Sequence, residues 1–88
     1  MDMELKIYDL FIPSGALLFY VGCCDDLTTA EKLSLSFEKF NSIASSCNAK
    51  MFTDPDNNTW NYFITKQDAE LFVEKLEPYL ILAKLTEN

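Results

Sequence analysis

Residues 49–85 constrain the fold most strongly, because the period of the hydrophobic pattern changes within them from two residues to three or four. Trp60, Tyr62 and Ile64 stand at every second position, which is the period of a β-strand. Aromatic and β-branched residues also suit the pleated, half-buried surface of a strand. Residues 49–53 supply an earlier strand to pair with it, so we expect a strand, a turn, a strand and then a helix.

The turn and the helix have signals of their own. Asn57 and Asn58 tolerate positive φ and can close a tight hairpin. Thr65, with Asp68 three residues later, is typical of a helix N-cap followed by an acidic first turn. Pro78 removes one intrahelical hydrogen bond, so we expect it to kink or restart the helix. The apolar face of this helix comprises Ala69, Phe72, Val73, Leu76, Leu80 and Ala83.

The first part of the chain has a looser version of the same plan. Two apolar runs, residues 4–12 and 16–21, are separated by Pro13 and Gly15 and predict a hairpin. Its second strand is either buried on both faces, or buried on one face and paired with a partner on the other. A continuous buried helix is disfavoured because Pro13 interrupts it.

A helix is expected next. Thr28 and Glu31 have the spacing of a capping box. We expect one helix from there to Asn48, which can take the left-handed position at its end. Leu35 lies about opposite the apolar stripe and is expected to be exposed. That stripe comprises Ala30, Leu33, Phe37, Phe40, Ala44 and Cys47.

These elements predict an α+β fold with the order ββα-ββα. Residues 1–48 form the first ββα half and residues 49–88 the second, within a single domain of 88 residues. A four-stranded antiparallel sheet with both helices on one face would bury the two apolar stripes in one core.

Charge restricts the partners. Fourteen acidic residues face seven lysines, the net charge is −7, and the chain contains neither arginine nor histidine. Direct binding to nucleic acid is disfavoured because it needs a basic surface, and anionic membranes would repel the chain. A basic protein surface is the partner that long-range attraction favours. The alternative is that the charge serves solubility alone.

Seven acidic residues are the candidates for an anionic binding face. They lie in expected loops or on one side of the second helix, where neighbours of like charge cost a few tenths of a kcal/mol per pair. A solvated surface is the alternative for all of them. The loop residues are Asp25, Asp26, Asp54 and Asp56, and the helix residues are Glu70, Glu74 and Glu77.

Catalytic and metal sites are not expected. The absence of histidine removes the usual general base and the Cys–His and Ser–His nucleophiles. Asp54, Asp56 and Asn58 have the spacing of the first calcium ligands, but Thr59 and Thr65 replace the glycine and the glutamate of such a loop. We therefore expect neither an enzyme nor a metal, and no cofactor.

Cysteines and hydropathy favour the cytoplasm. Three cysteines, with Cys23 and Cys24 adjacent, do not build a disulfide framework, and we expect a reducing compartment. Cys47 belongs to a helix face and is expected to be a buried small apolar residue. No basic segment typical of a signal peptide begins the chain, and no apolar run is long enough to span a membrane.

A second apolar stripe runs along the last helix. Leu71, Leu82 and Leu85 lie on the side away from the core stripe. A small domain has little depth to bury a helix on two faces, so this stripe indicates a homodimer or a docked partner. The alternative is that the first hairpin or a chain terminus covers it.

The overall profile resembles that of small phage-encoded anti-defence proteins. The resemblance rests on short length, acidity, absent arginine and histidine, reduced cysteines and an α+β plan, and not on a motif. Anti-CRISPR and DNA-mimic anti-restriction proteins are the comparison. The resemblance implies that the protein inhibits a host nucleic-acid-processing complex and acts in the host cytoplasm. An immunity protein or antitoxin against a basic toxin, and a homo-oligomeric chaperone-like module, are the alternatives.

Overall fold

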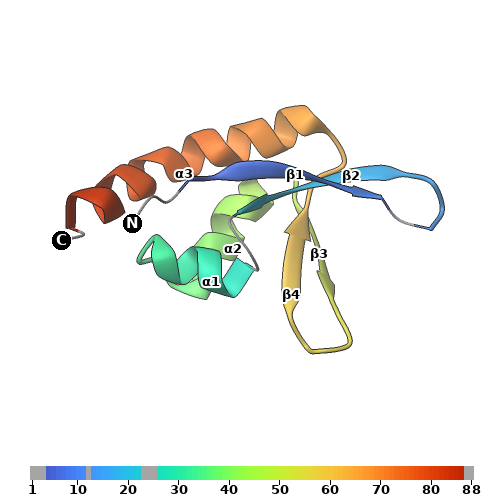
Figure 1. Cartoon of the computed structure of the whole chain (residues 1–88), viewed down its shortest axis with the longest axis horizontal. Helices are drawn as coiled ribbons and strands as arrows, with labels where there is room; N and C mark the ends of the chain where they lie inside the picture. Colours follow the sequence, from blue (N-terminus) through green and yellow to red (C-terminus); the bar gives the residue numbers. More distant parts are fainter. Residues whose placement is uncertain (1–3, 12, 23–25, 87–88) are drawn as a thin grey trace.

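Two β-hairpins lie against three helices in the computed structural model, which describes residues 4–11, 13–22 and 26–86 (Figure 1). The α+β class is confirmed. The order is ββααββα, because the first expected helix is divided in two. The elements are β1 Lys6–Phe11, β2 Leu17–Gly22, α1 Asp26–Lys32, α2 Phe37–Ser46, β3 Lys50–Thr53, β4 Thr59–Tyr62 and α3 Lys66–Thr86.

Both expected hairpins form, but the single four-stranded sheet does not. β1 pairs with β2 and β3 pairs with β4, each pair antiparallel, in two separate sheets. One bridge joins them: Phe19 and Phe63 exchange backbone hydrogen bonds of 2.9 and 2.7 Å. The pairing between the hairpins does not continue beyond this bridge, because the chain reaches the N-cap of α3 at Thr65, two residues after Phe63. The hairpins cross at a steep angle in Figure 1.

The predicted single helix at residues 28–47 is wrong, because Ser34 takes a left-handed conformation with φ 58°. The amide of Ser34 donates to the carbonyl of Glu31, and that of Leu35 donates to Ala30. This is the Schellman pattern of bonds that ends a helix. It also turns Leu35 toward the core, where it is partly buried, so the expectation that Leu35 is exposed is wrong.

The expected capping box at Thr28 and Glu31 is wrong, because α1 already begins at Asp26 and includes Thr28. The end of α2 and the start of α3 follow the sequence signals more closely. Asn48 has φ 65° and ends α2 as expected, and Asn57 has φ 66° in the hairpin turn. The hydroxyl of Thr65 accepts a hydrogen bond of 3.2 Å from the amide of Asp68, which confirms the N-cap. Pro78 lies inside α3 without dividing it, so of the two expected outcomes, a kink or a restart, the restart does not occur. Packing of buried side chains on both sides of Pro78 explains why the helix continues.

The core lies between the helices and the inner faces of the two hairpins. Phe72 of α3 is at its centre, with ring centroids 5.2 Å from Phe40 and 5.3 Å from Phe63. Both predicted apolar stripes contribute, and Cys47 is buried as expected. The buried apolar residues are Val21, Ala30, Leu33, Phe40, Ala44, Cys47, Phe63, Ala69, Phe72, Leu76 and Leu80.

Hydrogen bonds between three polar residues connect the elements around this core. Asp26 is only 1% exposed, and its Oδ2 accepts hydrogen bonds of 2.6 Å from the backbone amide of Asn61 and 2.7 Å from its Nδ2. The same Nδ2 donates to Oδ1 of Asn41 at 2.7 Å. These bonds connect α1, α2 and β4. Asp26 is therefore a structural residue, and its expected place on a solvated acidic face is wrong.

Replacing Asp26 tests this structural role. Asp26→Ala should lower the free energy of unfolding by about 2–4 kcal/mol, because two buried donors of Asn61 lose their charged acceptor. Denaturant unfolding followed by circular dichroism measures the change. Asp56→Ala, which removes the same charge from an exposed turn, should change it by less than about 0.5 kcal/mol. Equal effects of the two variants would contradict the assignment.

Candidate binding site

The strand alternation separates an inner from an outer face on each hairpin. On β2, Phe19 and Val21 pack into the core, so Tyr20 projects from the opposite face. On β4, Asn61 is buried, which directs its two neighbours outward. Aromatic side chains dominate these outer faces, and they are Tyr8, Tyr20, Phe52, Trp60 and Tyr62.

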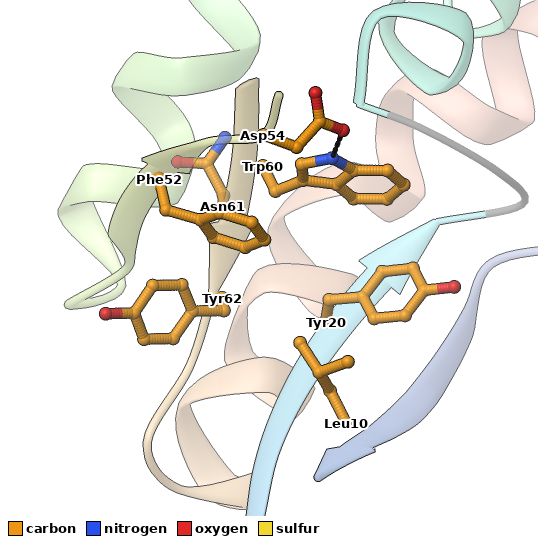
Figure 2. Close-up of a pocket in the computed structure, with 7 residues that line it drawn as sticks. All are labelled: Leu10, Tyr20, Phe52, Asp54, Trp60, Asn61 and Tyr62. Carbon is orange, nitrogen blue, oxygen red and sulfur yellow. Dashed lines mark hydrogen bonds between the residues drawn. The ribbon is translucent and has the colours of Figure 1, made fainter. Parts of the chain in front are cut away.

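The two outer faces meet in a pocket of about 290 Å³. It exists because the described parts of the hairpins share a single backbone bridge and cross, instead of continuing as one flat sheet. Figure 2 shows the rings arranged around the pocket, with Leu10 at one end and Asp54 at the other. Its lining residues are Leu10, Tyr20, Phe52, Asp54, Trp60, Asn61 and Tyr62.

Ring contacts hold two walls of the pocket in place. The Tyr20 ring stacks on Tyr8 at 4.8 Å and 19°, and meets Trp60 edge-to-face at 5.5 Å and 83°. Phe52 and Tyr62 form a tilted pair at 5.8 Å on the second hairpin. Such offset and edge-to-face geometries are the favourable ones for aromatic pairs. The pocket is therefore bordered by mutually supported rings.

Asp54 is the charged residue of the pocket. Its Oδ2 accepts a hydrogen bond of 2.9 Å from the indole Nε1 of Trp60. The backbone amide of Asn58 donates to Oδ1 at 2.8 Å, and its Nδ2 donates to Oδ2 at 3.3 Å. The bond from Trp60, followed by that from the Asn58 amide, holds the pKa of Asp54 below its ordinary value. The carboxylate is thus ionised at neutral pH and fixes both the turn and the indole.

The predicted acidic residues do not form one surface. Asp54 and Asp56 lie in the β3–β4 turn, whereas the three glutamates are exposed on α3. In Figure 1 the turn and α3 are at opposite sides of the molecule. Asp26 is buried, and Asp25 lies outside the described residues. The glutamates of α3 are Glu70, Glu74 and Glu77.

The second apolar stripe of α3 is exposed, as its spacing predicts. Leu82 is 58% and Leu85 74% exposed, and Ile81 lies beside them. Leu71 is also exposed, but eleven residues separate it from Leu82, which is about 16 Å along a helix. The stripe is therefore an apolar end of α3 with one isolated leucine. No described residue covers this end.

The aromatic pocket was not identified from the sequence. The signal was present in part, since Trp60 and Tyr62 share one face of a strand whose other face carries Asn61 and Phe63. Large aromatic residues usually indicate the core side, but here the core side carries Asn61 as well as Phe63, while Trp60 and Tyr62 face outward. The buried Asp26–Asn61 pair and the burial of Phe63 against Phe72 fix this face, and the first of these contacts connects residues 35 positions apart.

No protein-family model, no curated protein and no solved structure matches the chain. Within the described ranges, no helix has both the length and the hydropathy to cross a bilayer. In that same part of the chain, no cluster of three or more cysteine, aspartate or glutamate side chains is arranged to hold a metal ion. Cys23 and Cys24 lie outside it.

The pKa of Asp54 gives a test of the site geometry. Because it is lowered in the fold, the stabilisation it provides is complete above the ordinary pKa of an aspartate and is lost as the pH falls through the lower, folded value. The NMR signal of the Trp60 indole N–H should therefore titrate with a midpoint below that ordinary value. Asp54→Asn should remove this titration. A midpoint at or above the ordinary value would contradict the hydrogen bonds described.

Proposed function

We propose that this protein is a non-enzymatic inhibitor that binds a basic surface on a nucleic-acid-processing protein complex, such as a host CRISPR or restriction nuclease. The observation that carries the proposal is the ionised Asp54 beside an open aromatic pocket, on a chain of net charge −7. Nucleic-acid-processing complexes carry the extended basic surfaces that such a chain attracts.

The composition of the pocket supports binding to protein. Aromatic residues are enriched in protein interfaces and supply much of their binding energy from buried central positions. Here several aromatic side chains surround a pocket while remaining partly exposed, with Phe52 at 41%. A carboxylate at the edge adds charge complementarity to a basic partner.

The usual size of a protein interface indicates how much of this protein's surface the proposed partner would cover. A standard protein interface buries about 800 Å² per partner. That is roughly one seventh of the 5640 Å² surface of this chain. The pocket alone is smaller than this, so the contact area extends onto the β3–β4 turn with Asp56 and onto the outer face of β1 with Tyr8.

Salt dependence tests this proposal. Tagged protein is incubated with bacterial lysate and washed at about 50 mM or about 500 mM salt, since screening weakens charge pairing. We expect a nucleic-acid-processing complex to be retained at low salt, lost at high salt, and inhibited in a cleavage assay. Asp56→Lys should weaken retention about tenfold, and Glu74→Lys on the other side of the molecule only a few-fold.

Other outcomes separate the alternatives. Capture of a single basic toxin, with loss of its toxicity, would favour an immunity protein or antitoxin. Retention that does not change with salt would contradict electrostatic docking altogether. Equal effects of Asp56→Lys and Glu74→Lys would indicate attraction to net charge without a defined site.

A homo-oligomeric module is the second candidate, and the exposed Ile81, Leu82 and Leu85 favour it. A second copy of the chain would bury this apolar end against itself around a two-fold axis. This candidate predicts a dimer in light scattering at about 100 µM, a concentration at which a micromolar Kd gives mostly dimer. Leu82→Asp should convert it to monomer, whereas Leu27→Asp, at an exposed site on α1, should not. A monomeric native chain would exclude this candidate.

A further inference from the structure

We propose that the aromatic pocket between the two hairpins accepts the guanidinium group of an arginine side chain from the partner protein. This inference rests on the proposed function and names the chemistry of its central contact. The juxtaposition that carries it is an anionic carboxylate, Asp54, at the end of a pocket whose walls are the rings of Tyr20, Phe52, Trp60 and Tyr62 (Figure 2).

The walls favour a cation. The faces of aromatic rings carry partial negative charge, and a cation within about 6 Å of a ring centroid is attracted to them, most strongly by Trp. The indole N–H of Trp60, which is the positive edge of its ring, is already bonded to Asp54. What remains for a ligand is the ring surface, together with the charge of the carboxylate. A neutral or anionic group would gain nothing from that charge.

Arginine suits this site better than lysine. Both oxygens of Asp54 already accept hydrogen bonds, so a new cation gains mainly from charge and from contact with the rings. A guanidinium is planar, stacks on aromatic faces and is more weakly hydrated than an ammonium, so it enters an aromatic pocket at lower desolvation cost. The volume of about 290 Å³ is at the small end of ligand pockets, which fits one side chain.

The arginine has to come from another protein. The chain contains no arginine, so a second copy cannot supply one. A nucleotide would also stack on the rings, but its phosphate would meet Asp54 and a chain of net charge −7.

Trp60 allows a direct test, because it is the single tryptophan of the chain and lines the pocket. The indole N–H signal is followed by NMR while N-acetyl-arginine amide is added to the isolated protein. We expect a saturable shift. N-acetyl-citrulline amide has nearly the same shape but no charge. It should bind at least about tenfold more weakly than the arginine probe, because it lacks the charge that Asp54 and the rings attract. N-acetyl-lysine amide should bind more weakly than the arginine probe.

Matched variants distinguish specific binding in the pocket from attraction to the net charge of the protein. Asp54→Asn and Asp56→Asn remove the same charge two residues apart, but only Asp54 lines the pocket. We expect about tenfold weaker binding for Asp54→Asn and less than about threefold for Asp56→Asn. Phe52→Leu should weaken binding about fivefold by removing a ring face, whereas Met51→Leu, on the opposite face of β3, should not.

Three results would overturn the inference. The first is no saturable shift with the arginine probe, and the second is an equal response to citrulline or lysine. The third is a stronger response to a nucleoside monophosphate, which would assign the pocket to nucleotides. If the captured complex binds in a salt-dependent way while the arginine probe leaves Trp60 unaffected, the proposed function stands and only this inference fails.

Discussion

Among the described residues, one backbone bridge, between Phe19 and Phe63, joins the two hairpins, and the surface that contains the aromatic pocket depends on it. Their backbone groups exchange hydrogen bonds of 2.9 and 2.7 Å, while the Phe63 side chain is buried against Phe72 of α3. Because the pairing ends after one bridge, the hairpins are free to cross. Their outer faces then form a concave surface, and the aromatic residues on these faces surround a pocket.

Much of the fold could be predicted because its signals are local. The Thr65 cap, the left-handed Asn48, the Asn57 turn and the two apolar stripes each depend on residues close together in the chain. The errors came from non-local contacts or from a residue type with weak preference. Serine seldom adopts φ 58°, so nothing at Ser34 predicted the break between α1 and α2. The crossing of the hairpins likewise depends on a pairing 44 residues apart in sequence, from Phe19 to Phe63.

The candidate site was predicted less well than the fold. Four of the acidic candidates lie in expected loops, and this position does not distinguish Asp26, which is buried against Asn61, from Asp56, which is exposed. The sequence predicts Asp54 from its charge and its place in a loop, while its contact with Trp60 makes it part of a pocket. The aromatic residues were assigned to strands without a face, because the face is decided by which neighbours are buried.

Two of the exposed regions of the described chain have different chemistry. One contains the aromatic pocket and the acidic β3–β4 turn, and the other is the apolar end of α3 with Leu82 and Leu85. A chain of 88 residues has little surface to spare, and both regions have the composition of an interface. We propose the first region as the surface for a basic partner, on the ground of charge, and the second as the alternative surface for a copy of the same chain.

Hydrogen exchange of the protein bound to its captured partner tests the central claim most directly, namely that the face between the hairpins is the binding surface. Amide protection on complex formation is compared across the chain. Our account predicts that added protection is concentrated in β2, in β3 and in the turn from Asp54 to Asn58. Added protection confined to the end of α3 around Leu82, with the hairpins unchanged, would contradict it.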